Sequence, residues 1–227
     1  MSKARSVTGR SREPSRAHSS KPPPSEAGED NSRERIHLSA LKLFSRYGYD
    51  GVSLQMIADD VGLHKSSLFH HYTGKLELMR EAVLAVIAEL LELLDPLLGQ
   101  EEPTIETLYE GMMRLVDYFS EQPDSARLLV TIMTAPNGSD VAKLAADERS
   151  VGFYLKLSRW LERARRLGVV RSTSIRQAIP NAIGLVLFYP AVASDLRDLV
   201  GPDAFSPRAR QVRRDEVMRL LKAMFAP

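Results

Sequence analysis

Apolar residues recur at helical spacing along almost the whole chain after residue 31, and this pattern constrains the fold more than any other feature. Its first example places Ile36, Ala40, Leu43, Phe44 and Tyr47 on one face of a helix. No segment keeps the period-two alternation of a half-buried strand, and no short β-rich runs are bounded by hairpin turns. The sequence therefore predicts an all-α protein of about nine helices.

Composition narrows the chemistry that such a helical chain can carry. Its 227 residues fit a small domain joined to a larger one. Cysteine is absent, which excludes disulfides, thiolate catalysis and cysteine-ligated zinc. The net charge is only +2, so any affinity for nucleic acid must come from local clusters of basic residues. We expect no cofactor and no metal.

Secretion and membrane insertion are not expected either. The N-terminus has no apolar run that could form a secretory signal. The most apolar stretch, Ala178–Ala193, is interrupted by Pro180, Asn181 and Gly184, and it is shorter than the roughly 20 residues that a membrane span needs. It predicts a helix buried in protein, in a cytoplasmic molecule.

Residues 1–31 predict a disordered basic tail that precedes the helices. This segment is rich in Ser, Pro and Arg and has almost nothing to bury. Its basic residues, opposed in the first 25 positions by Glu13 alone, are Lys3, Arg5, Arg10, Arg12, Arg16 and Lys21. Such a tail either keeps the protein in solution or adds sequence-independent contacts to phosphates.

Residues 32–74 predict a three-helix domain that contains a helix-turn-helix. Asn31 and Glu34 form a capping box for the first helix, which Gly48 ends. Ser53 caps a second helix, whose apolar stripe consists of Leu54, Ile57, Ala58 and Val61. Gly62 ends that helix, and a third runs from near Lys65 to about Tyr72. Two short helices joined by a glycine turn are the DNA-binding arrangement.

The segment Val61–Lys75, which we call the recognition segment, concentrates the features expected of a surface that reads DNA. It contains two lysines and three histidines but no acidic residue. The start of a recognition helix meets base edges, and the donor-rich Lys65, Ser66 and Ser67 lie there. Leu68 faces the opposite way, toward the core. Alternatives are a structural subdomain, a protein-binding surface, or a histidine metal site that lacks a carboxylate to complete it.

Residues 33–80 resemble the DNA-binding domain of the TetR family of bacterial regulators. The matching strings are RERIHLSALKLFSRYGYDGVS and LQMIADDVGLHKSSLFHHYTGKLEL. The shared positions are Ile57-Ala58, Gly62, Lys65, Leu68-Phe69, His71-Tyr72 and Lys75 with Glu77.

This resemblance implies roles for individual residues. Ser53 and Lys75 would hold phosphates at helix starts, and His71 would touch the DNA backbone. Gln55, Lys65, Ser66 and Ser67 would face the groove. Family members most often have tyrosine where this chain has Phe69, and a small capping residue where it has His64. The predicted DNA-binding set is Ser53, Gln55, His64, Lys65, Ser66, Ser67, Phe69, His70, His71 and Lys75.

Residues 75–227 predict a larger helical domain for ligand binding and dimerisation. We expect a helix from Lys75 to about Leu94, broken by Pro96, and another from Ile105 to Phe119, broken at Gln122-Pro123. A short helix at Leu128–Met133 comes next, followed by a long helix from about Asp140 to Leu167. Ser174 with Gln177, and Ser206 with Pro207, predict the starts of the last two helices.

The last two helices are the predicted dimer interface. Recognition helices of this kind bind palindromic half-sites as two-fold dimers, and the resemblance implies a four-helix interface. The candidate residues, which could instead be core of one subunit, are Ile183, Val186, Leu187, Tyr189, Val217, Leu221 and Met224. A basic run between Arg208 and Lys222 is expected to be a solvated helix face.

The middle helices are rich in methionine and aromatic residues, which suit an adaptable apolar pocket. The pocket candidates, whose alternative is ordinary core packing, are Tyr109, Met112, Met113, Phe119, Met133, Phe153, Trp160 and Phe188. These features predict a repressor that a small apolar or amphipathic ligand releases from a palindromic operator on double-stranded DNA. The alternative is a regulator or adaptor that acts through protein contacts without a ligand. An enzyme is not expected, because no phosphate-binding loop or nucleophile motif is present.

Overall fold

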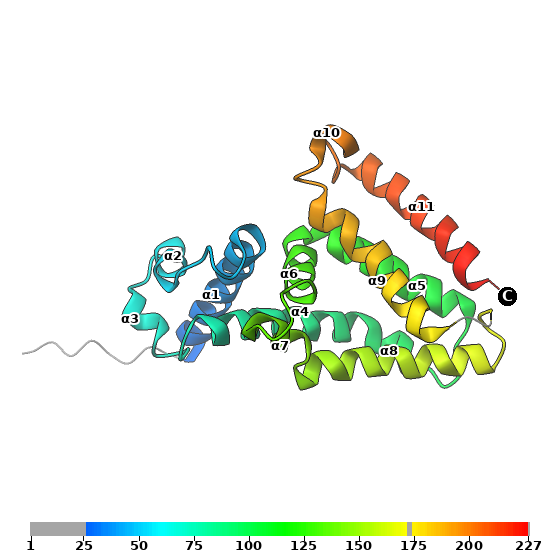
Figure 1. Cartoon of the computed structure of the whole chain (residues 1–227), viewed down its shortest axis with the longest axis horizontal. Helices are drawn as coiled ribbons and strands as arrows, with labels where there is room; N and C mark the ends of the chain where they lie inside the picture. Colours follow the sequence, from blue (N-terminus) through cyan, green and yellow to red (C-terminus); the bar gives the residue numbers. More distant parts are fainter. Residues whose placement is uncertain (1–25, 172–173, 227) are drawn as a thin grey trace, which may run out of the picture.

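The chain folds into helices throughout the part that the computed structural model describes, residues 26–171 and 174–226, which confirms the all-α prediction (Figure 1). Eleven helices lie in these ranges, against about nine predicted. They are α1 (Glu26–Tyr47), α2 (Leu54–Asp60), α3 (Lys65–Leu68), α4 (Lys75–Leu98), α5 (Ile105–Glu121), α6 (Pro123–Met133), α7 (Asp140–Ala145), α8 (Glu148–Arg166), α9 (Ile175–Val192), α10 (Arg197–Val200) and α11 (Pro207–Phe225).

The first three helices gather at one end of the molecule, and α4 runs from them into the helical body (Figure 1). Helix α1 begins at Glu26, so the prediction that the tail extends to residue 31 and that Asn31 caps the helix is wrong. Residues 1–25, which hold the basic cluster of the predicted tail, lie outside the described residues. Helix α1 ends as predicted, because Gly48 takes a φ of 68° and its amide bonds the Phe44 carbonyl at 3.0 Å.

The helix-turn-helix forms where the sequence predicts it. The Ser53 hydroxyl accepts the Met56 amide at 3.2 Å and caps α2, and Gly62 turns the chain with a φ of 69°. Helix α3 is shorter than predicted. It ends at Leu68, and the chain after it forms tight turns through His70 and His71. Tyr72 is buried beyond these turns, which draws the chain inward toward α4.

Two predicted helix boundaries in the body are wrong. One helix continues beyond its predicted end, and another is interrupted where it was predicted to continue. Helix α4 continues through Pro96 to Leu98, because a proline in the last turn removes few backbone bonds while Leu94 and Leu97 are both buried. The helix predicted over 140–167 is two helices, α7 and α8, separated at Ala146-Asp147. The helix is interrupted at Asp147, because the Asp147 carboxylate accepts the Arg149 amide at 3.0 Å and caps a new helix, α8.

The starts of the last long helices differ in their caps. At α9 the Ser174 side chain makes no cap hydrogen bond, so the predicted capping box is wrong, and the Gln177 amide bonds the Ser174 carbonyl instead. At α11 the Ser206 hydroxyl accepts the Ala209 amide at 3.3 Å, and Pro207 takes the first helical position as predicted. The short helix α10 between them was not predicted.

One hydrophobic core joins the helix-turn-helix to the body. It extends from Ile36 in α1 to Phe225 in α11, with α6 packed between α1 and α9 and with α4 against α1 and α8. Two polar contacts cross the same junction. The Ser45 hydroxyl of α1 donates to Asp124 of α6 at 3.0 Å, and Arg80 of α4 pairs with Asp147 at 2.8 Å. No helix in the described ranges has the length and apolar character of a membrane span.

Candidate nucleic-acid interface and body cavity

Helix α3 and the turns after it present polar and aromatic side chains on a buried apolar base. Leu68 is fully buried, as are Ile57 and Ala58 of α2, so α3 is fixed against α2, which in turn packs on α1. His64, Lys65, Ser66, Phe69 and His70 are exposed on the outer side. The Lys65 ammonium lies 5.9 Å from the centre of the Phe69 ring, so these two side chains form one exposed edge.

The remaining predicted DNA-binding residues flank this edge. Ser53 and Gln55 are exposed at the start of α2, whereas Ser67, His71 and Lys75 are half-buried. The Gln55 amide donates to Asp59 at 2.7 Å, which draws it toward the acidic end of α2. His64 precedes α3 without a side-chain cap bond, and its ring is left exposed, as its poor capping ability predicts.

Lys75 differs from its predicted role, because its ammonium is engaged inside the domain. The Nζ atom donates to the Tyr49 carbonyl at 2.7 Å and to the Val52 carbonyl at 2.9 Å. It also lies 4.1 Å from the centre of the Tyr49 ring. The side chain therefore fixes the α1–α2 loop to the start of α4, and what remains free there for an anion is the backbone of the helix start.

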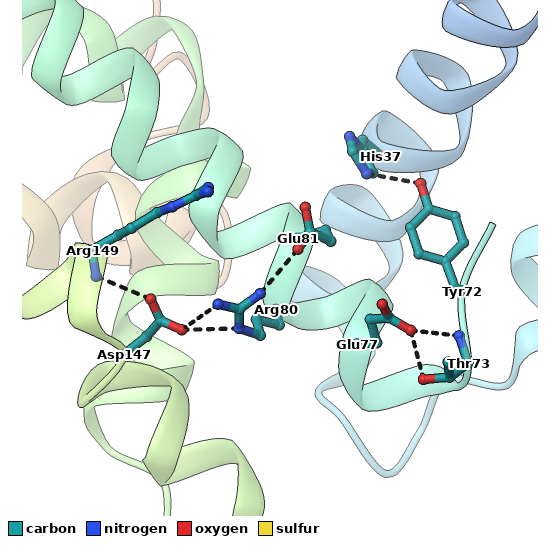
Figure 2. A network of polar contacts seen from close by, with 8 residues as sticks. All are labelled: His37, Tyr72, Thr73, Glu77, Arg80, Glu81, Asp147 and Arg149. Carbon is teal, nitrogen blue, oxygen red and sulfur yellow. Dashed lines mark hydrogen bonds and ion pairs between the residues drawn. The ribbon is translucent and has the colours of Figure 1, made fainter.

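A polar network that sequence reasoning missed fixes the end of the recognition segment (Figure 2). Tyr72 and His37 share a hydrogen bond of 2.9 Å between the phenol oxygen and Nε2. Glu77 accepts the Thr73 amide at 2.5 Å and the Thr73 hydroxyl at 2.6 Å. Burial lowers the pKa of His37, so its ring is held neutral against the tyrosine. The capping-box spacing does not reveal this contact, because Thr73 precedes the N-cap Gly74 and Glu77 lies four residues on rather than three.

Figure 2 also shows how this end of α4 is tied to the body. The Arg80 guanidinium contacts Asp147 through Nε at 2.9 Å, and it contacts Glu81 at 3.1 Å. Burial favours the protonated acid, but hydrogen bonds from the Arg149 amide and Arg80 outweigh it and hold the pKa of Asp147 below its ordinary value. Asp147 thus caps α8 and anchors α4 at the same time.

The body contains an apolar cavity of about 380 Å³ that is partly open to solvent. Five of the eight predicted pocket residues line it: Met112, Phe119, Met133, Phe153 and Trp160. Tyr109, Met113 and Phe188 do not, and for these three the pocket prediction is wrong.

The predicted dimer residues of α9 and α11 lie mostly inside the subunit. Ile183, Val186 and Leu187 line the cavity. Val186, Leu187, Val217 and Leu221 are buried in the single chain, so they present no surface to a second copy. Tyr189 and Met224 are half-buried, and Arg213 stacks over the Tyr189 ring at 4.8 Å.

Phe188 is 60% exposed, so the face of α9 predicted to line the pocket points to solvent instead. It shares an outer stripe with Gln177, Asn181 and Gly184, at helical spacing. A Cβ atom built on Gly184 would meet nothing within 4 Å. On α11 the exposed apolar residues are Val212 and Leu220.

Comparisons with known proteins converge on one family. Residues 36–82 match the family model for bacterial regulatory proteins of the tetR family. IcaR of Staphylococcus epidermidis, a negative transcriptional regulator of a biofilm operon, is 30% identical over 105 residues, which are 46% of this chain and 55% of that protein. The chain thus spans about half the length of the curated relatives it matches.

Two solved structures extend the likeness beyond the N-terminal domain. The TetR-family regulator PfmR of Thermus thermophilus superposes with a TM-score of 0.63 at 23% identity, over 86% of this chain and 97% of that one. SCO3833 of Streptomyces coelicolor, a member of the same family, gives a TM-score of 0.59 at 26% identity, over 82% and 88% of the two chains.

Proposed function

We propose that the chain, whose residues 36–82 match the family model for bacterial regulatory proteins of the tetR family, represses transcription by binding a palindromic operator. The observation that carries the proposal is the recognition segment, which exposes His64, Lys65 and Ser66 at the start of α3 and contains no acidic residue. Such a helix start meets base edges in the major groove. IcaR, the curated relative, is a negative regulator, which supports repression.

Selection of bound DNA from a random pool tests this function directly. We expect a palindrome whose half-sites lie about one or more helical turns apart. Binding to random duplex should weaken steeply with salt, because lysine contacts to phosphates release counterions. Recovery of no preferred sequence, together with no binding at low salt, would contradict the proposal and favour an adaptor that acts through protein contacts.

A dimer is part of this proposal, because two half-sites need two recognition segments. We place its interface on the outer faces of α9 and α11 rather than on the residues that the sequence predicted. Phe188, Val212 and Leu220 supply exposed apolar surface there. The open space at Gly184 would let a helix of the second copy approach closely.

We propose in addition that a ligand in the body cavity releases the protein from DNA. The cavity volume falls within the roughly 300–1,000 Å³ of known ligand sites. The break between α7 and α8 adjoins the cavity, because Ala145 and Ser150 line it on either side of Asp147. Asp147 in turn holds Arg80 near the start of α4, so a change in the cavity would reach the helix that carries the recognition segment.

A further inference from the structure

The cavity walls restrict the charge that a ligand can carry. Helices α4, α5, α6, α8 and α9 supply most of the lining, and no described residue that lines it has a charged side chain. Two cations on the lining helices α5 and α8 are paired with acidic side chains. Lys156 contacts Asp95, and Arg114 contacts Glu110 at 2.7 Å. An ionised group placed inside would lose its hydration without gaining a partner, which is strongly unfavourable.

Three of the four polar side chains in the lining offer a ligand little hydrogen bonding. The Thr107 hydroxyl donates to Gln100 at 2.9 Å, and the Ser150 hydroxyl lies 3.4 Å from the Leu144 carbonyl. Trp160 is 8% exposed, and its indole nitrogen has no hydrogen-bond partner among the described residues. This nitrogen is buried from the cavity as well as from outside water, so the wall offers a ligand no free hydrogen bond there.

We infer that the ligand is an uncharged, largely hydrocarbon molecule, such as an ester or ketone, held by apolar contacts with the cavity wall. This inference rests on the proposed ligand-responsive function and specifies the class of effector. A carboxylate of the same size is disfavoured, because the cavity offers it no counter-charge. The exposed Met133, Val151 and Tyr154 also line the cavity, so they mark where such a molecule enters.

A matched pair of probes separates charge from size. Methyl decanoate and decanoate share one hydrocarbon chain, but at pH 8 only the second is ionised. Trp160 is the only tryptophan of the protein, so its fluorescence reports on the cavity directly. We expect saturable binding of the ester, at least about tenfold tighter than binding of the acid anion. Equal or tighter binding of decanoate, or no binding of the ester, would overturn the inference.

Two variants locate the binding site, with isothermal calorimetry on the full chain as the readout. Ala182→Phe places a ring in the cavity wall and should weaken ester binding at least about tenfold by occlusion. The control Ala88→Phe makes the same change at an exposed position of α4 outside the lining and should leave it unaltered. Undiminished ester binding in Ala182→Phe would overturn the site.

Operator binding measured with and without the ester distinguishes the proposed ligand class from the proposed release of DNA by the ligand. Ester binding that leaves operator affinity unchanged would support the ligand class and contradict release by the ligand. Normal operator binding by a protein that ignores the ester would contradict the ligand class and leave the regulator itself intact.

Discussion

Lys65 and Lys75 are both lysines of the recognition segment, but their charged groups have different surroundings in the structure. Lys65 is exposed beside Phe69, whereas Lys75 donates to two backbone carbonyls and packs on Tyr49. The family pattern contains both residues, and the sequence alone assigned both to DNA. The contacts of Lys75 depend on the path of the α1–α2 loop, which local spacing does not reveal.

Replacing each lysine by methionine should therefore give opposite results. Lys75→Met leaves the Tyr49 and Val52 carbonyls without their donor, so we expect a loss of about 1–3 kcal/mol in the free energy of unfolding, measured in urea. Lys65→Met should leave stability almost unchanged and reduce the salt slope of DNA binding by about one unit. Similar stability losses in the two variants would contradict this division of roles.

His37 makes stability depend on pH through its bond to Tyr72. Burial lowers the pKa of His37 in the folded protein, so as pH falls the unfolded chain takes up a proton first. The stabilisation is complete above the ordinary histidine pKa of about 6.5 and is lost as pH falls through the lower folded value.

Urea unfolding between pH 5 and pH 8 measures this dependence. We expect His37→Gln, which is not titratable, to lose less stability toward pH 5 than the natural protein does. The control His70→Gln changes an exposed histidine and should keep the natural pH dependence. Identical curves for the natural protein and His37→Gln would show that another group carries the effect.

Helix boundaries followed the sequence at Ser53, Gly48 and Gly62, although the capping signals at Asn31 and Ser174 failed. Ser53, Gly48 and Gly62 act locally, so their effects could be predicted from spacing alone. Pro96 and Asp147 could not be predicted in the same way. The first is tolerated because its neighbours are buried, and the second interrupts a good helical pattern because Arg80, 67 residues away in sequence, holds it in place.

The junction at Asp147 should contribute measurably to stability. Asp147→Ala removes the cap of α8 and the partner of Arg80, and we expect a loss of about 0.5–2 kcal/mol in the free energy of unfolding. The control Asp140→Ala removes an exposed pair with Lys143 in α7 and should have little effect. Chemical denaturation of both variants checks this, and an equal loss in both would contradict the anchoring role of Asp147.

Helix α9 shows why sequence located the right element but the wrong face. Apolar residues surround it, so periodicity does not distinguish the side toward the cavity from the side toward solvent. Ile183, Val186 and Leu187 line the cavity, and Phe188 faces outward, which reverses the two predicted sets. The packing of α9 against α6, with α5, α8 and α11 beside it, decides which face is inward.

For the whole molecule, the outward Phe188 is the residue on which the proposed dimer depends most. Phe188→Glu puts a charge into the apolar stripe, and we expect the protein to sediment as a monomer at micromolar concentration with weakened operator binding. Leu167→Glu is the control, because Leu167 is 58% exposed at the end of α8. A dimer that persists in Phe188→Glu but dissociates in Leu167→Glu would place the interface elsewhere.

Because α4 is long, a small tilt of this helix at one end produces a large displacement at the other. Its 24 residues span about 36 Å, so each degree of tilt about one end displaces the other by about 0.6 Å. In a two-fold dimer the two recognition segments would move symmetrically, which doubles the change in their separation. A tilt of only two or three degrees at the cavity would then misplace the pair by about 3 Å, as much as the length of a hydrogen bond.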